Sequence, residues 1–184
     1  HMAGDEVMQQ AFLSGADFHT VTAANVFHVA PEAVTGEMRA SAKAVNFGIV
    51  YGISEFSLAE DIGVSRYEAK DYIESYLANY PGVRAYMKQV VEDARETGHT
   101  VTMYGRKRYI PELKSSNFNI RQSAERMTLN TPIQGSAADL IKLAMIRIDK
   151  ALQEQFPDAK LLLQVHDELI VECPEEIAEE VAAL

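Results

Sequence analysis

Apolar residues recur three and four positions apart along most of this chain, as they do on one face of an α-helix. The run between Pro81 and Gly98 is the clearest case, because proline suits the first turn of a helix and glycine its end. Upstream of it, Ser65 and Glu68 have the spacing of a capping box, which predicts the start of another helix. The pattern therefore predicts a mostly helical α+β fold.

A further long helix is expected within residues 117–155. Pro132 and Gly135 lie inside it. Because proline lacks a backbone N–H and clashes with the preceding turn, we expect the helix to break or kink at this point.

A first hairpin is predicted at residues 100–113, where the runs 100–104 and 108–113 flank Gly105-Arg106-Lys107. Its basic tip could contact a phosphate backbone. A solvated turn with no ligand would have the same composition, so the residues alone leave both readings open.

A second hairpin is predicted more strongly, because the runs 161–165 and 169–173 are apolar on both sides of His166-Asp167-Glu168. These flanks favour a buried hairpin. Adjacent strand residues face opposite sides, so Asp167 and Glu168 could share a metal site only at the turn. The alternative is an ordinary turn, in which aspartate is common.

The segment 36–51 carries two cations and two aromatic side chains at four-residue steps, which advance about 40° each around a helix and so share one broad face. They are Arg39, Lys43, Phe47 and Tyr51. Arginine and lysine could grip phosphate oxygens, and an aromatic ring one turn on could stack on a base or sugar. Gly48 and Gly52 would allow a close approach. The alternative is a solvated basic edge with both aromatic residues in the core.

Two smaller polar features have the same ambiguity. Arg126, Asn130 and Gln134 lie at four-residue steps and could read the minor-groove acceptors that all base pairs share, or form an ordinary polar helix face. His19 could donate to a phosphate, or serve as a cap or core residue.

Composition adds limits rather than a function. The hydrophobic fraction of 47% is enough for a core. The single Cys173 excludes an intramolecular disulfide and a cysteine-based zinc cluster, and favours a reducing, cytoplasmic setting. No apolar run approaches the roughly 18 residues of a membrane span, so no membrane partner is expected.

The net charge of −10 argues at first against a nucleic-acid partner, but the charges are unevenly distributed. Residues 101–150 hold nine basic and four acidic side chains, whereas residues 151–184 hold one basic and nine acidic. A polyanion could dock on the first segment while the second attracts cations. The simpler alternative is that net acidity maintains solubility.

Three of these segments, in this order and spacing, resemble the motifs of family A DNA polymerases, the bacterial DNA polymerase I group. Residues 39–52 are similar to the fingers-helix motif, residues 125–135 to the motif that follows it, and residues 164–168 to the palm-hairpin motif. The similarity covers essentially the whole chain, and three ordered motifs are highly specific.

For the incoming nucleotide, the resemblance implies that Arg39 and Lys43 hold the triphosphate with help from His19. It counts Lys43 among the catalytic residues. Phe47 would pack against the sugar and base, and Tyr51 would lie on the template side of the insertion site.

For DNA, the resemblance implies that Arg126, Asn130 and Gln134 contact the new base pair and primer. Arg106 would meet the template strand, and His166 would lie near the primer end.

For catalysis, the resemblance implies two Mg²⁺ ions, with Asp167 binding both and Glu168 supporting the site. The family's first metal-binding aspartate, and the glutamate that excludes ribonucleotides, would fall before His1. We therefore expect this chain to be a fragment that does not polymerise DNA alone.

The implied architecture is the fingers of a right-hand polymerase plus part of the palm, without a thumb. Its expected parts are residues 1–16 (palm-to-fingers helix), 17–115 (fingers, with the nucleotide-binding helix 36–51 and the basic hairpin 100–113) and 116–184 (partial palm, with the catalytic hairpin 161–173). Expected partners are primer–template DNA, dNTP, the rest of the polymerase chain and, through an open palm edge, a second copy.

Three other functions stay open. A non-catalytic nucleotide- or DNA-binding module would need no metal chemistry. A piece of a single-subunit RNA polymerase would have a similar fingers helix and acidic hairpin. A metal-dependent phosphohydrolase would use Asp167 and Glu168, but it would lack a second ligand cluster.

Overall fold

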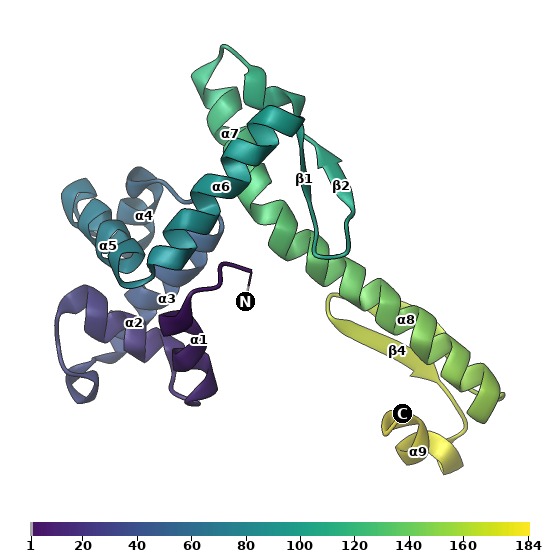
Figure 1. The fold of residues 1–184 in the computed structure, drawn as a ribbon. Coiled ribbons are helices and arrows are strands. Elements are labelled where there is room, and N and C mark those ends of the chain that lie inside the picture. Colours follow the sequence, from purple (N-terminus) through teal and green to yellow (C-terminus); the bar gives the residue numbers. More distant parts are fainter. Residues whose placement is uncertain (1) are drawn as a thin grey trace. The chain divides into compact units, whose positions relative to one another are not determined.

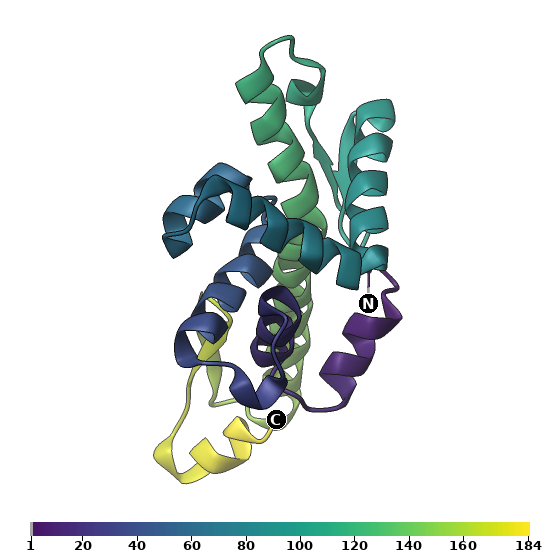
Figure 2. The ribbon, with the colours of Figure 1, turned by 90° about the vertical axis from the view of Figure 1, so that its left-hand side faces the viewer.

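The computed structural model describes residues 2–184 and divides into two compact units (Figures 1 and 2). The first unit comprises the chain up to Val101 together with residues 107–132, and the second comprises residues 102–106 and 133–184. Both are dominated by helices, and each strand pairs within a two-stranded sheet, which confirms the mostly helical α+β class.

The elements of the first unit are α1 (Glu6–Leu13), α2 (Phe18–Phe27), η1 (Pro31–Ala33), α3 (Gly36–Val50), α4 (Glu55–Ile62), α5 (Arg66–Asn79), α6 (Pro81–Thr97), β1 (His99–Val101), β2 (Lys107–Tyr109), η2 (Pro111–Lys114) and α7 (Phe118–Asn130). The segment η3 (Thr131–Gly135) crosses into the second unit, which continues with α8 (Ser136–Gln155), β3 (Lys160–Val165), β4 (Glu168–Glu172), η4 (Glu175–Ile177) and α9 (Ala178–Ala182).

Helix starts and ends follow the capping signals in the sequence. Ser65 accepts from the backbone of Glu68, whose carboxylate accepts from the Ser65 backbone, so the predicted capping box is confirmed. Pro81 occupies the first turn of α6, and Gly98 ends it with a φ of 78°. In this left-handed region only glycine is free of strain.

The main core of the first unit lies between α3, α4 and α5. Its fully buried members are Val45, Ile49, Leu58, Ala69, Tyr76 and Tyr80. Burying a large apolar side chain of this kind stabilises a fold by about 1.5–3 kcal/mol. This core holds the inner face of α3 in place and leaves its opposite face free.

The first predicted hairpin is shorter than expected. Its strands cover only His99–Val101 and Lys107–Tyr109, so the prediction that the second strand reaches Leu113 is wrong. Pro111 has no backbone donor for the ladder, and the chain turns into η2 instead. This turn buries Ile110 and Leu113 beside α6 and α7.

The predicted interruption of the long helix is confirmed. Thr131–Gly135 form a π-helical segment that contains Pro132 and Gly135, between the α-helices α7 and α8. A π segment inserts extra backbone into a helix and therefore shifts the faces on either side.

The second predicted hairpin is confirmed as β3 and β4, which run beside the second half of α8 (Figures 1 and 2). Two expectations about it are wrong. Glu168 pairs with Val165 inside the ladder, so the turn consists of His166 and Asp167 only. The hairpin is also largely exposed within the described residues, because alternation turns only one of its faces, with Leu169 and Val171, toward the groove beside α8.

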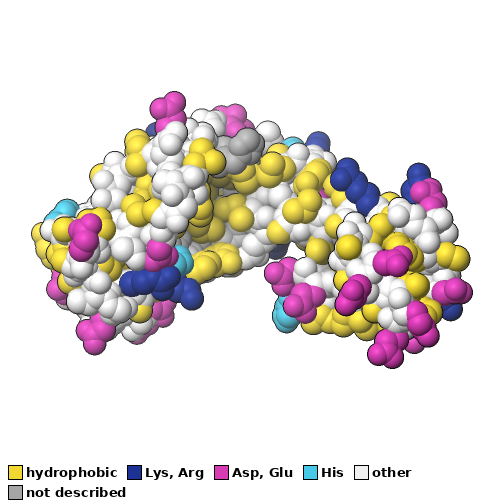
Figure 3. All heavy atoms as spheres, turned by 90° about the horizontal axis from the view of Figure 1, so that it is seen from below, with side chains coloured by type: hydrophobic (Ala, Val, Ile, Leu, Met, Phe, Trp, Pro, Cys, Tyr) yellow, Lys and Arg dark blue, Asp and Glu magenta, His cyan; other side chains and the backbone are white. Residues whose placement is uncertain are grey.

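The outer surface of the second unit mixes acidic and apolar side chains, as its part of Figure 3 (right) shows. Leu162, Leu163 and Ile170 are 42–53% exposed. Among residues 2–184, no helix combines the length and apolar character needed to cross a membrane.

Candidate nucleotide-binding site

The outer face of α3 carries the four residues that the sequence placed together: Arg39, Lys43, Phe47 and Tyr51. All four are exposed, and the two aromatic side chains keep 49% and 42% of their surface accessible. The alternative of two core aromatics is therefore wrong. The buried face of the same helix contains Ala42, Val45, Asn46, Gly48 and Ile49.

The Phe47 ring is the centre of this site. The His19 ring, from α2, has its centroid 5.9 Å from that of Phe47. The Lys43 ammonium lies 6.0 Å from the same centroid, at the limit of a cation–π contact. The structure thus brings His19, Lys43 and Phe47 together from two helices, with a cation and an imidazole beside an accessible aromatic face.

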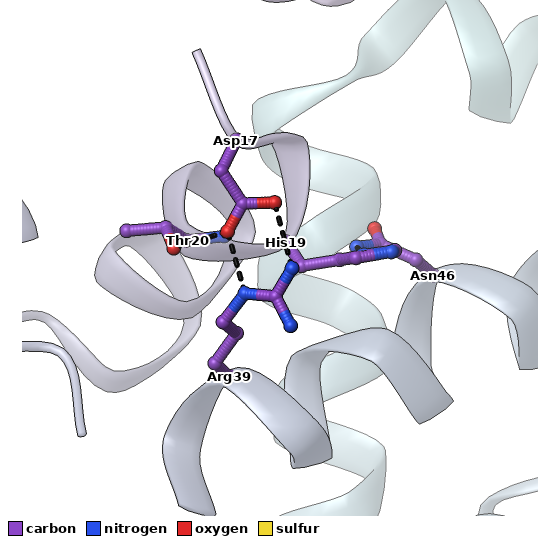
Figure 4. Close-up of polar contacts among 5 residues, drawn as sticks. All are labelled: Asp17, His19, Thr20, Arg39 and Asn46. Atoms are coloured by element: carbon purple, nitrogen blue, oxygen red, sulfur yellow. Dashed lines mark hydrogen bonds and ion pairs between the residues drawn. The ribbon is translucent and has the colours of Figure 1, made fainter. Parts of the chain in front are cut away.

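Arg39 reaches the same end of α2 through Asp17 (Figure 4). Its Nε donates to Asp17 Oδ2 at 2.6 Å and its Nη2 to Oδ1 at 3.0 Å. Asp17 also caps α2 by accepting from the Thr20 backbone. The hydrogen bond from Arg39, followed by that from Thr20, holds the pKa of Asp17 well below its usual range.

His19 is held from its buried side by a short polar chain. The Asn46 Nδ2 lies 2.9 Å from His19 Nδ1, and the Asn46 Oδ1 accepts from the Thr22 hydroxyl at 3.0 Å. Asn46 and Thr22 are 5% and 1% exposed.

The end of α3 packs against α7 through a glycine. Gly52 has a φ of +68°, and a Cβ built there would lie 3.2 Å from Arg126 Cγ and 3.3 Å from Leu129 Cδ1. Gly48 similarly faces the side chain of Ile53. The close approach expected at Gly52 is therefore present, and it places Arg126 beside the turn that follows Tyr51, whereas Gly48 meets only the side chain of a residue in the same turn.

The set Arg126, Asn130 and Gln134 is divided by the π segment. Arg126 and Asn130 lie on α7 and are half-buried, whereas Gln134 lies within η3 and is exposed. The Oδ1 of Asn130 is buried and accepts no hydrogen bond from the described residues. An acceptor left unpaired in this way costs about 1–3 kcal/mol unless a group outside the described residues donates to it.

Arg106 lies in the second unit, where Asp139 on α8 holds it. Its Nε donates to Asp139 Oδ1 at 2.5 Å, and the Thr102 hydroxyl donates to Oδ2 at 2.7 Å. These two bonds, that of Thr102 first, lower the pKa of Asp139. The Arg106 side chain is still 61% exposed and can reach a further anion.

The acidic hairpin tip projects His166 and Asp167 into solvent. His166 has a φ of 53°, and its carbonyl accepts from Gln164 Nε2 at 2.7 Å. Asp167 and Glu168 are exposed carboxylates, which suit a hard cation. Residues 2–184 contain no group of three or more histidine, cysteine or acidic side chains that could hold a metal ion.

Sequence reasoning missed Asp17, Thr22 and Asn46. A signal existed for Asp17, because aspartate is a preferred N-cap residue and a predominantly apolar segment follows it. Asn46 could be found as the polar residue on the otherwise apolar face of its helix. Nothing in the sequence indicated that it contacts His19.

Comparison with known proteins identifies relatives over the whole chain. The whole chain, residues 1–184, matches DNA polymerase family A. It is 52% identical to DNA polymerase I of Geobacillus stearothermophilus, over 100% of this chain and 21% of that protein. It is 54% identical to DNA polymerase I of Bacillus subtilis strain 168, over 96% of this chain and 20% of that protein. The chain thus spans about a fifth of the length of these relatives.

A solved structure is similar over the full chain. It is the POL domain of Pol1 from M. smegmatis in complex with DNA primer-template and dNTP. The TM-score is 0.89 and the sequence identity 44%, with 100% of this chain and 32% of that chain covered.

Proposed function

The chain belongs to DNA polymerase family A, and on that premise we propose that it supplies the nucleotide-binding helix and several DNA contacts of a template-directed DNA polymerase of replication or repair. The single observation that carries this proposal is the exposed face of α3. Lys43 is exposed there beside the accessible ring of Phe47, and Arg39 is half-exposed although it is paired with Asp17.

In the parent reaction, the primer 3′ hydroxyl attacks the α-phosphorus of a dNTP and pyrophosphate leaves. Charge on the phosphate oxygens must be neutralised while the nucleotide is held in line. Arg39 would bind phosphate oxygens through the guanidinium nitrogen outside its pair with Asp17, or through the whole fork once the phosphate displaces Asp17, and Lys43 would act as a point charge. Phe47 would pack on the sugar and base, and Tyr51 would lie on the template side.

The DNA contacts belong to both units. Arg126 and Asn130 would meet the minor-groove side of the new pair, together with Gln134. The exposed Arg106 would contact the template backbone and His166 the primer end. The DNA and dNTP in the similar M. smegmatis structure support these partners.

Asp167 and Glu168 would supply carboxylate oxygens to divalent metal ions, which we propose to be two Mg²⁺. When bound, the ions would neutralise charge on the reacting phosphate. Because residues 2–184 hold only part of such a site, we propose that the chain alone does not extend a primer. Robust primer extension that is lost in Asp167→Ala would contradict this, whereas DNA binding without extension agrees with it.

Titration calorimetry with a dNTP tests the proposal. Wild type should bind, and Lys43→Ala should weaken binding by about tenfold or more, the loss expected for one hydrogen bond to a charged group. Lys70→Ala is the matched control, because Lys70 is an exposed lysine on α5 outside the site. Equal affinities for all three proteins, or no binding by a folded wild type, would contradict the proposal.

A further inference from the structure

The buried face of α3 contains a polar side chain, Asn46, among apolar neighbours. It is 5% exposed, and both ends of its amide are satisfied. A buried amide without partners would be costly, so its orientation is determined by the groups that it meets. Those groups are the Thr22 hydroxyl on one side and the His19 ring on the other.

The amide orientation in the structure gives the hydrogen bonds along this chain one direction. The amide oxygen of Asn46 can only accept, so Thr22 Oγ1 donates to it at 3.0 Å. The amide nitrogen can only donate, so His19 Nδ1, 2.9 Å away, must accept through its lone pair. The proton of a neutral His19 ring is then on Nε2.

We propose that Asn46 is a positioning residue that holds His19 in the Nε2–H tautomer, with that N–H presented to the phosphates of the incoming nucleotide. This rests on the proposed function, in which His19 contacts the triphosphate. The two ring nitrogens lie on opposite sides of the imidazole, so anchoring Nδ1 on the buried amide leaves Nε2 on the open side.

The ring is also confined between aromatic neighbours. Its centroid lies 5.9 Å from that of Phe47, with an interplanar angle of 43°, and 6.3 Å from that of Phe18, with an angle of 58°. Rotation of the ring would break the bond to Asn46 and leave a buried donor unpaired, which costs about 1–3 kcal/mol.

The tautomer matters because only the Nε2–H form can donate a hydrogen bond to a phosphate oxygen on the open side of the ring. With the proton on Nε2, a neutral imidazole donates a hydrogen bond to a phosphate oxygen. With the proton on Nδ1, it would turn a lone pair toward the anion. Asn46 would therefore make His19 a phosphate donor without requiring that the ring be charged.

The competing arrangement is a reversed amide. The Asn46 oxygen would then accept from Nδ1–H of His19, its nitrogen would donate to the Thr22 hydroxyl, and Nε2 would lack a proton. Heavy-atom positions are nearly the same in both, but the proton is on a different ring nitrogen.

Imidazole ¹⁵N–¹H correlation spectra of the ¹⁵N-labelled chain without nucleotide distinguish the proposed from the reversed orientation of the Asn46 amide. His19 is assigned from the signals lost in His19→Gln. We expect an unprotonated Nδ1 and a protonated Nε2. A protonated Nδ1, or an averaged signal from both tautomers, would overturn the proposal.

Two variants test whether Asn46 is the cause. Asn46→Asp offers only acceptors and should move the His19 proton to Nδ1 or produce the doubly protonated ring, while Thr22→Ser keeps the hydroxyl and should preserve the wild-type signals. Unchanged His19 signals in a folded Asn46→Asp would overturn the proposal. If that variant does not fold, the wild-type spectrum alone still decides.

The dNTP affinity separates this inference from the proposed function. If the His19 proton moves to Nδ1, Asn46→Asp should bind dNTP about tenfold more weakly than Thr22→Ser, because the hydrogen bond from Nε2 to a charged group is then lost. The Nε2–H tautomer in a wild type that binds no dNTP would overturn the proposed function and leave the assignment of Asn46 standing.

Discussion

At the scale of single residues, the contact between Asp17 and Arg39 has two effects on the site. The carboxylate orients the guanidinium at the start of α2, and it occupies the Nε and Nη2 edge that a phosphate would also favour. Figure 4 shows the third nitrogen of Arg39 directed away from Asp17. Asp17 is thus an anion inside a site for anions.

Asp17→Asn should therefore strengthen dNTP binding by a few-fold, because an exposed ion pair contributes little and a repulsive charge is removed. Asparagine caps helices as well as aspartate does, so the free energy of unfolding should change little. Calorimetry measures the affinity. Glu55→Gln is the control, because it neutralises a similar exposed pair with Arg66 elsewhere. A weaker affinity in Asp17→Asn would show that orienting Arg39 is the dominant effect.

At the scale of elements, the sequence predicted those features that depend on local chemistry. The capping box of α5, the start and end of α6 and the break at Pro132 all follow from backbone donors and acceptors within a few residues. The end of β2 was mispredicted, although Pro111 carried the signal. The contacts of α2 with α3 could not be predicted, because they join residues more than twenty positions apart.

The approach of α3 to α7 at Gly52 can be measured with two alanine substitutions. Gly52 and Gly63 have φ values of +68° and +70°, so alanine is strained by about 1–2 kcal/mol at each. Of these two glycines, Gly52 has neighbours within 4 Å of the added Cβ and Gly63 has none. Urea unfolding should therefore show that Gly52→Ala lowers the free energy of unfolding more than Gly63→Ala does. Equal decreases in the free energy of unfolding would mean that α7 shifts to accommodate the added methyl group without a loss of stability.

The bond network of Asp139 predicts a pH dependence for the second unit. Because its folded pKa lies below the ordinary value of 3.8, Asp139 stabilises the fold above that pH, and this contribution is lost as the pH falls through the folded pKa. In urea unfolding between pH 6 and pH 2, the free energy of unfolding of wild type should fall toward that of Asp139→Asn as the pH is lowered. Asp149→Asn, an exposed position on α8, is the control. A difference that is constant with pH would contradict the assignment.

At the scale of the whole molecule, the candidate site was predictable as residue types on one helix face, and the resemblance supplied their roles. The exposure of the β3–β4 hairpin could not be predicted from the sequence, because burial depends on which other elements pack against it. Leu162, Leu163 and Ile170 stay open within the described residues, and each strand has an unpaired edge there.

This exposed hairpin predicts self-association that grows with protein concentration, since an open apolar edge can pair with another chain. Light scattering over a wide concentration range measures it. Ile170→Lys should shift the protein toward the monomer, whereas Gln153→Lys adds the same charge on α8 and should not. A wild type that is monomeric throughout would refute this prediction.

The central claim is that the outer face of α3 and the start of α2 bind the incoming nucleotide. A dNTP titration of the ¹⁵N-labelled chain, followed by backbone amide shifts, tests it most directly. Saturable shifts concentrated at residues 17–20 and 39–51 are the predicted result. A folded chain whose shifts do not change, or change only in the second unit, would contradict it.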